Sequence, residues 1–200
     1  MATVPEATEQ SRLLRYSNAA VTLHWLTAVL ILVQIWLGFT FADLPKGPAR
    51  VEVFAWHKTV GVTILLLALI RLAVRLKNPP PPFPEELPRW ERLAAVWNHR
   101  IFYFLLIIIP LAGLLAVSGG ATKSTTGLIG GIPFPLIPGI SEGGGEISGG
   151  VHEILVFAMI ALLALHVGAA LKHQFFVPSR AAGRMPPFRA PRDEDPVRRD

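Results

Sequence analysis

The 200-residue chain contains no cysteine and few charged residues, and each scarcity excludes a class of function. Without cysteine it can form no disulfide, iron–sulfur cluster, c-type haem attachment or thiolate zinc site. Only 16% of its residues are charged, against about a quarter in a typical soluble domain. Its net charge of +5 comes from residues that flank apolar runs instead of forming one basic face, so we expect no nucleic-acid partner.

Four long apolar runs explain the low charge and predict an all-α fold. Each run is long enough to cross a bilayer once as a helix, and we expect spans at about 19–42, 55–76, 98–118 and 151–173. The first run follows a polar segment and is too long for a signal peptide, so we expect no cleavable signal. The sequence predicts a four-helix transmembrane bundle over 18–177, with an N-terminal tail at 1–17 and a basic C-terminal tail at 178–200.

The segments between the runs differ in character. Pro79 to Pro82 cannot be helical and is typical of a stiff polyproline linker. The stretch after Pro88 is amphipathic, which favours a helix along the membrane interface. The segment 119–149 is rich in glycine, and a loop of this length is uncommon unless it is functional or mobile. We expect its apolar part, 132–137, to cover one end of the bundle and its glycine-rich part to be flexible.

Basic residues are unevenly distributed among the connecting segments. The segments before the first run, between the second and third runs, and after the fourth run are rich in lysine and arginine, whereas the other two loops hold few. The positive-inside rule then predicts that both termini lie in the cytoplasm. The glycine-rich segment 119–149 is expected on the opposite, outer side.

Four histidines lie in the runs at depths that match in pairs. His152 and His166 are 14 residues apart, so they share one face of the fourth helix and lie about 21 Å apart along its axis. In the predicted orientation His24 and His166 fall at the inner depth, and His57 and His152 at the outer depth. Each pair joins two different helices, as a b-type haem with two imidazole ligands requires. The pattern therefore predicts two haem sites at different depths.

Other interpretations of the histidines remain open at this stage. A single membrane histidine is more often a hydrogen-bonding group between helices than a metal ligand, and the first run also contains a second polar interruption, Gln34. Two pairs of histidines at matching depths, which we call two layers, favour metal ligands over hydrogen-bonding groups between helices. A zinc or copper site is disfavoured, because neither layer has the third or fourth ligand that tetrahedral zinc needs.

Small and cationic residues near the two layers agree with a bound macrocycle. Gly61, Gly168 and Ala169 each lie within about one turn of a histidine, although ordinary packing of small residues between helices explains them equally well. Haem propionates are anionic, so we expect them to pair with Arg71 at the inner depth and Lys58 at the outer depth. Interfacial snorkelling is the alternative explanation for Arg71.

Four segments resemble the bacterial cytochrome b561 family in order over about residues 15–185: RYSNAAVTLHWL, AWHKTVGVTILLLALIRLAVRL, NHRIFYFLLIIIPLAGLL, and VHEILVFAMIALLALHVGAALKHQFF followed by GRM. The resemblance implies a multi-pass, four-helix protein of the bacterial cytoplasmic (inner) membrane with two b haems. The ligands of the family fall on four histidines of this sequence, His24, His57, His152 and His166. The family also usually has histidines at the positions of His99 and His173.

The resemblance implies electron transfer in a respiratory-type chain, with ubiquinone as the exchange partner and superoxide as one proposed donor. Relatives serve as cytochrome b subunits of hydrogenases and formate dehydrogenases, so an anchor subunit that relays electrons from such an enzyme is an alternative. His99 and His173 would either exchange protons with a quinone or hydrogen-bond propionates and loops. Membrane lipid, a quinone and an electron donor of unknown identity are the expected partners, and a homodimer is also compatible with the sequence.

A haem-free membrane transporter or sensor is an alternative from another class, in which the histidines would bind protons or a metal ion. No run holds a carboxylate near its middle, which counts against a proton-driven carrier. Glu153 is expected at the start of the fourth helix, where the helix dipole favours a negative charge. We predict no catalytic residue.

Overall fold

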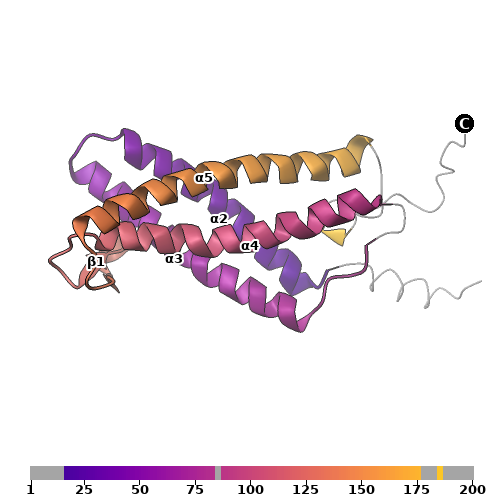
Figure 1. Ribbon diagram of the computed structural model, residues 1–200, viewed down its shortest axis with the longest axis horizontal. Helices are drawn as coiled ribbons and strands as arrows, with labels where there is room; N and C mark the ends of the chain where they lie inside the picture. Colours follow the sequence, from indigo (N-terminus) through magenta and orange to yellow (C-terminus); the bar gives the residue numbers. More distant parts are fainter. Residues whose placement is uncertain (1–15, 84–86, 177–183, 187–200) are drawn as a thin grey trace, which may run out of the picture.

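The computed structural model describes residues 16–83, 87–176 and 184–186 (Figure 1). Most of the predicted tails, 1–17 and 178–200, lie outside these residues. The described part of the chain is predominantly helical, and four of its helices are long and apolar enough to cross a membrane. The prediction of an all-α protein with four spanning helices is therefore confirmed.

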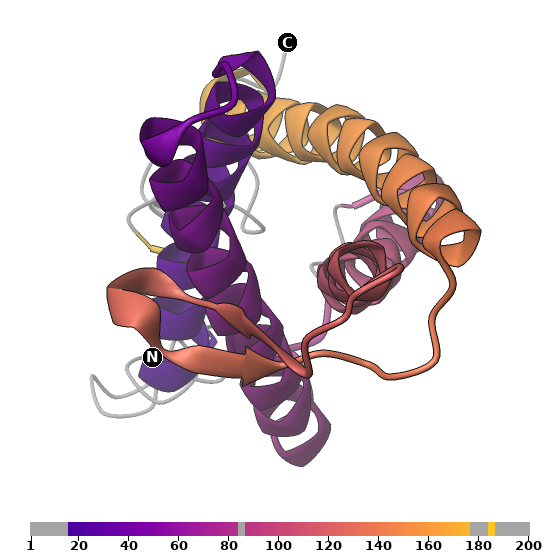
Figure 2. The same cartoon turned by 90° about the vertical axis from the view of Figure 1, so that its left-hand side faces the viewer.

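Each spanning helix is longer than the apolar run that predicted it. The four helices are α2 (Asn18–Asp43), α3 (Pro48–Lys77), α4 (Arg89–Ser118) and α5 (Glu142–Leu171), and a π-helical turn over Lys172–Phe176 extends α5. In sequence order α2 packs on α3, α3 on α4 and α4 on α5. Viewed along the bundle, α2 and α3 form one side and α4 and α5 the other (Figure 2).

Local sequence signals account for most helix starts. The hydroxyl of Ser17 accepts a hydrogen bond from the backbone N–H of Ala20 (3.3 Å) and caps α2. Pro48 stands in the first turn of α3, where its missing N–H has no cost. Helix α4 continues from Arg89 through Pro110 to Ser118, so the amphipathic stretch after Pro88 is the first part of a span. The prediction of a separate interfacial helix there was wrong.

Helix α5 starts nine residues before the predicted span, within the glycine-rich segment 119–149. The prediction that this glycine-rich part is a flexible loop was wrong, and Glu153 lies inside the helix and not at its start. Ser141 caps α5 by accepting from the N–H of Gly144 (3.1 Å). The glycines then allow close packing, because a Cβ on Gly145 would lie 2.6 Å from the Cα of Gly119, the residue that caps the C-terminal end of α4. This contact offsets the low helix propensity of glycine.

The glycine contact between α4 and α5 leads to a stability prediction. We expect Gly145→Ala to destabilise the bundle by about 1–3 kcal/mol, because the added methyl group must push the two backbones apart. Gly143→Ala is the matched control, because a Cβ there meets no atom within 4 Å, and it should stabilise the helix by about 0.4–1 kcal/mol. The midpoints of thermal unfolding in detergent measure both effects. Equal midpoints for the two variants would contradict this account of the contact.

A short β-hairpin marks one end of the bundle, which we call the hairpin end. Strands β1 (Thr125–Gly127) and β2 (Pro133–Pro135) pair antiparallel, with a 3-10 turn between them. The hairpin docks on α3, where Lys58 Nζ donates to Thr126 Oγ1 (2.6 Å) and the N–H of Ile129 donates to Thr59 Oγ1 (3.0 Å). We call the opposite end, where α2 starts and α5 ends, the terminal end (Figure 1).

The buried core lies between the helices, and the outer surface is largely apolar. Eight buried side chains from α2, α3, α4 and α5 form one cluster: Ile31, Leu37, Val60, Ile64, Ala68, Leu105, Leu106 and Met159. Many large apolar side chains face outward, among them Trp36, Leu66 and Ile154. Such a surface suits the hydrocarbon of a membrane, where lipid tails take the place of protein contacts.

Candidate functional site

The four histidines of the spans lie in two facing pairs. His57 on α3 faces His152 on α5 towards the hairpin end, and their ring centroids are 6.2 Å apart. His24 on α2 faces His166 on α5 towards the terminal end, also with centroids 6.2 Å apart. Helix α5 contributes one ring to each pair, and the partner ring comes from the opposite side of the bundle. The structure thus brings together the same histidines that their predicted depths in the membrane had paired.

The separation within each pair suits one metal ion between two imidazoles. Metal–nitrogen bonds to histidine are about 2.0–2.1 Å long, so two rings that bind one ion from opposite sides have their centres roughly 6 Å apart. Both observed separations, 6.2 Å, agree with this value. Among the described residues, no group of three or more His, Asp or Glu side chains gathers as a metal site. The two pairs therefore have the donor set of a ring-bound iron, which takes four further nitrogens from the macrocycle.

Each of the four rings has one nitrogen in contact with a protein group. His152 Nδ1 donates to the carbonyl oxygen of Ile109 (2.8 Å), and the side-chain amide of Asn98 lies 2.9 Å from Nδ1 of His166. In the other two rings, the contacts come from Gln34 and Arg71. Within the described residues, the second nitrogen of each ring has no hydrogen bond. His152 shows the division typical of a metal-binding histidine, because its Nδ1 donates to a carbonyl and its Nε2 is left with a lone pair for a metal. In the other three rings the contacting protein atom is a donor nitrogen.

The pair at the hairpin end is closely surrounded by glycines. A Cβ on Gly113 would lie 3.1 Å from Nδ1 of His152, and a Cβ on Gly38 would lie 3.4 Å from Cε1 of His57. Gly61, which the sequence had suggested as room for a macrocycle, instead faces the amide nitrogen of Gln34 at 3.2 Å. These glycines leave the two imidazoles room to stand between the helices.

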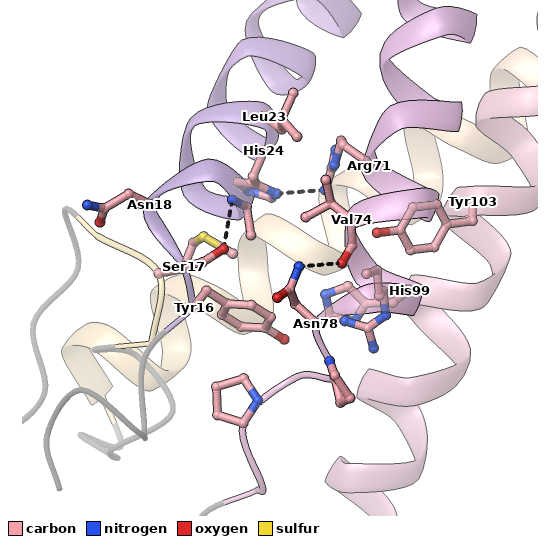
Figure 3. Close-up of a pocket in the computed structure, with 15 residues that line it drawn as sticks. Tyr16, Ser17, Asn18, Leu23, His24, Arg71, Val74, Asn78, His99 and Tyr103 are labelled. Carbon is pink, nitrogen blue, oxygen red and sulfur yellow. Dashed lines mark hydrogen bonds between the residues drawn. The ribbon is translucent and has the colours of Figure 1, made fainter. Parts of the chain in front are cut away.

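At the terminal end, His24 lines a cavity of about 720 Å³, which is within the usual range for cofactor pockets. Figure 3 shows His24, Arg71, His99 and Tyr103 around it. Arg75 also lines the cavity, and none of the described residues that line it is a carboxylate. The cavity is therefore cationic and suits an anionic group.

Arg71 connects this cavity to His24. Its Nη2 donates to Nδ1 of His24 (3.3 Å), and its guanidinium lies 5.9 Å from the ring centre of Tyr103. A guanidinium can only donate, so this contact places the ring proton of neutral His24 on Nε2. To present a lone pair at Nε2, His24 needs Arg71 to release Nδ1. An anionic carboxylate in the cavity would draw the guanidinium away.

Residues Arg184–Pro186 close the terminal end beside the cavity. Arg184 donates to the carbonyl oxygen of Pro81, its own carbonyl accepts from the N–H of Tyr16 (3.3 Å), and Met185 lines the cavity. The indole N–H of Trp25 donates to the carbonyl of Pro186 (2.6 Å). Burial lowers the pKa of Arg184 from its ordinary value, yet an arginine stays charged at neutral pH. This segment ties the chain after α5 to the start of α2.

The remaining predicted site residues have defined positions. Lys58 points to the hairpin, with Nζ on Thr126 and 4.8 Å from the ring of Phe54. The ring of His99 lies 5.7 Å from that of His166, and His99 Nδ1 donates to the carbonyl of Ala95 (2.7 Å).

His173 lies outside both pairs. Its Nε2 is 3.2 Å from Glu91 Oε2, and Lys172 Nζ is 2.8 Å from Glu91 Oε1. These contacts join the end of α5 to the start of α4. A Cβ on Gly168 meets no atom within 4 Å, so that glycine borders open space.

Sequence reasoning missed the partners that orient the histidines. Asn98, Tyr103 and Gly113 all lie on α4, which carries no member of a pair, and Gln34 was noted only as a polar interruption. A polar or small residue inside an apolar run can indicate a possible partner for a histidine. The sequence does not predict which helix face contacts the histidine, because that depends on the rotation of the helix within the bundle.

Comparison with known proteins agrees with this geometry. The profile of the prokaryotic cytochrome b561 family matches residues 15–187. Cytochrome b561 homolog 2 of Escherichia coli (strain K12) is 28% identical over 172 residues, which cover 80% of this chain and 85% of the relative. The probable superoxide oxidase CybB of Yersinia pestis is 25% identical over 178 residues, covering 86% of this chain and 96% of the relative. Cytochrome b562 of Cereibacter sphaeroides is 24% identical, covering 85% of this chain and 94% of the relative.

The family match extends over all four spanning helices and over both histidine pairs. Membership of this family implies electron transfer, since a b-type cytochrome moves electrons by means of haem. This chain therefore belongs to the prokaryotic cytochrome b561 family of bacterial membrane electron-transfer proteins.

Proposed function

We propose that the protein binds two b haems, one between His57 and His152 and one between His24 and His166. The observation that carries this proposal is the two pairs of facing imidazoles along α5, with ring centres 6.2 Å apart in both cases. Haem b supplies one-electron chemistry between ferric and ferrous iron. The remaining chemistry belongs to the protein, which binds, orients and shields the two groups.

The four helices perform these tasks in a defined way. Helix α5 supplies one ligand to each site, and its two histidines are about 21 Å apart along the helix axis. That length is well over half of the roughly 30 Å hydrocarbon core of a bilayer. Ile109 and Asn98 hold the two α5 rings in their rotamers through hydrogen bonds. The apolar core between the layers excludes water and counter-ions from the interior.

Cationic side chains are proposed to pair with the haem propionates. Arg71 lines the cavity beside His24, and no described carboxylate competes for it there. Lys58 is the proposed cation near His57 and His152. Its contact with Thr126 uses one of three ammonium protons and leaves two for an anionic group.

The membrane orientation is also a proposal. The terminal end holds Arg71, Arg75 and Lys77 at the end of α3 and Arg89 and Arg92 at the start of α4. The positive-inside rule then directs this end to the cytoplasm and the hairpin end to the outer face of the inner membrane. Fusion of a reporter enzyme after residue 200 tests the orientation, and reporter activity restricted to the outer face would contradict it.

We further propose ubiquinone as the electron exchange partner, in a respiratory-type chain. The support is the family and the cationic cavity at the terminal end. The donor is a separate question, because one relative carries the name probable superoxide oxidase. Superoxide and a dehydrogenase-type partner are the two donors to compare. Reduction of the purified cytochrome by superoxide alone would favour the first, and co-purification with a dehydrogenase would favour the second.

A pyridine haemochrome assay on the purified protein tests the central proposal. We expect about two b haems per chain, because the structure contains two histidine pairs. A chain that binds no haem after expression with an adequate haem supply would contradict the assignment and favour a haem-free transporter or sensor. One haem per chain would contradict the two-site arrangement.

The tight contact at Gly113 gives a prediction about the site at the hairpin end. In Gly113→Ala the new methyl group would lie 3.1 Å from Nδ1 of His152 and must displace the ring from its bond to Ile109. We expect about 10–100-fold weaker haem retention at this site, measured by transfer to a haem-accepting protein. Gly143→Ala is the control, because its methyl group meets no atom within 4 Å and Gly143 lies at the start of α5, outside both histidine pairs. If both variants retain haem equally well, His152 does not depend on this contact.

A further inference from the structure

Arg184 is a buried cation at the terminal end, and it is only 8% exposed. It forms no ion pair with any described residue. We propose that Arg184 binds a propionate of the haem proposed between His24 and His166, and that this contact keeps the segment Arg184–Pro186 closed over the cavity. The inference rests on the proposed function, because it requires a haem in that site. It goes further by assigning a binding role to a residue outside the four spanning helices.

The contacts of Arg184 place it at the wall of the terminal-end cavity. Its guanidinium donates to the carbonyl oxygen of Pro81 and lies 5.7 Å from the ring centre of Tyr16. Both of these residues line the cavity, and so does Met185, the next residue in the chain. Figure 3 shows Tyr16 and His24 around this cavity. The side chain of Arg184 therefore packs directly on residues that an anion in the cavity would contact.

Positive charge gathers around this cavity without a negative counterpart. Arg71 and Arg75 line it, and none of the described residues that line it is a carboxylate. Burial lowers the pKa of Arg184, and the like charge of Arg75 lowers it further. Arg184 nevertheless stays charged at neutral pH, so three guanidinium groups share this end of the bundle. Glu91, a described carboxylate near the start of α4, is already paired with the end of α5. The cluster therefore calls for an anionic ligand.

A purely structural role explains Arg184 poorly. A buried charge without a partner of opposite sign is costly. The guanidinium lies over the rings of Tyr16 and Phe83, but contacts of this kind are weaker than that cost. A haem propionate supplies the missing charge, because it is a carboxylate that a guanidinium can bind through two parallel hydrogen bonds. The bond to Pro81 uses one of five N–H donors and leaves the others for such a ligand.

The backbone of the same segment is tied to helix α2, which carries His24. The carbonyl oxygen of Arg184 accepts from the N–H of Tyr16 (3.3 Å), and the carbonyl oxygen of Pro186 accepts from the indole N–H of Trp25 (2.6 Å). An anion that holds the Arg184 side chain at the cavity therefore also holds these two bonds in place. Haem binding at the terminal end and closure of the segment should then stabilise each other, because such coupling is reciprocal.

A redox titration of the purified holoprotein tests the pairing with a propionate. The variant Arg184→Gln removes the positive charge but keeps N–H donors for the carbonyl of Pro81. We expect it to retain two haems and to lower the ferrous-to-ferric ratio of the iron at the terminal end about threefold at a fixed applied potential, which equals about 28 mV for one electron. The physical reason is that ferric iron carries one more positive charge than ferrous iron, so the loss of a nearby cation favours the ferric state.

Three further variants complete the titration. Arg184→Lys keeps the charge, so its ratio should stay close to that of the wild type. Arg100→Gln is the matched control, because it removes the same charge from an exposed side chain over the ring of Trp97. It should leave both irons unchanged. The same titration in a His152→Ala background, which is expected to retain only the haem at the terminal end, assigns the shift to one iron.

Hydrogen exchange followed by mass spectrometry tests the closure of the segment. The N–H of Tyr16 bonds to the carbonyl oxygen of Arg184, so its exchange rate reports whether the segment is closed. His166→Ala is expected to lose the haem at the terminal end, and the Tyr16 amide should then exchange about tenfold faster as the segment opens. His152→Ala is the matched control, because it loses the other haem. Tyr16 should exchange there at the wild-type rate.

The outcomes separate this proposal from the proposed function. An unchanged ratio in Arg184→Gln with two haems bound would overturn the role of Arg184 and leave the haem assignment intact. An equal drop in Arg184→Lys or in Arg100→Gln would also overturn it, because the effect would then not come from this charge. If Arg184→Gln loses the haem at the terminal end, failure of Arg184→Lys to retain it overturns the proposal. Wild-type exchange of Tyr16 in a His166→Ala protein that has lost one haem overturns the coupling to closure. Full haem content after His166→Ala would instead overturn the proposed function.

Discussion

Replacing His57 or His152 by alanine is expected to remove one b haem per chain and leave the other in place. The rings from α3 and α5 face each other with their centroids 6.2 Å apart, and in the proposed site each would supply one nitrogen to the iron. A single remaining imidazole cannot hold the iron in a six-coordinate, low-spin state. The pyridine haemochrome value should fall from about two haems to about one. The optical spectrum should keep the band of the remaining haem.

His173→Ala is the control for this experiment. It removes a histidine that bonds to Glu91 and lies outside both pairs, so both haems should remain. A variant of His57 or His152 with normal content of both haems would contradict the ligand assignment. Loss of both haems together would contradict the independence of the two layers. The His24→Ala and His166→Ala variants should lose the other haem.

Replacing Arg71 by glutamine is expected to weaken haem retention at the terminal end about 10–100-fold, the usual effect of removing an outer partner. The guanidinium is the charged group that contacts His24 within a cavity lined by no described carboxylate. Its loss leaves an anionic propionate without that cation in a region of low dielectric, where unpaired charge is costly. Transfer of haem to an excess of a haem-accepting protein measures the effect, because a weaker site empties faster.

Arg100→Gln is the matched control for Arg71→Gln. It removes the same charge from the terminal end, but Arg100 is exposed and lies over the ring of Trp97. Haem loss at the wild-type rate in Arg71→Gln would show that snorkelling alone explains this arginine. Faster loss at the hairpin end would show that the substitution disturbs the whole bundle.

The spans could be predicted because hydrophobicity along the chain is a local property. The hydrocarbon core of a membrane requires about 20 apolar residues for each crossing, and helices satisfy their own backbone hydrogen bonds there. The depth of a histidine follows from its place in a span, so His24 could be matched with His166 without knowledge of packing. The same reasoning matched His57 with His152.

The helix ends could not be predicted as well, because they depend on contacts between distant segments. Glycine disfavours an isolated helix, yet Gly143 to Gly150 are helical because α5 packs directly on α4 at Gly119. The β-hairpin was missed for a similar reason. Its strands are only three residues long, and the hairpin is held by side chains of α3, among them Lys58.

The sequence by itself determined the number of membrane spans and the depth of each histidine, since both depend on the order of residues along one helix. Only the tertiary structure decided what surrounds each ring. It brought Gln34, Asn98 and Arg71 to three of the imidazoles and a backbone carbonyl to the fourth. The physical reason is that a helix can rotate about its axis without changing the depth of any residue. That rotation is set by side-chain packing across the whole bundle.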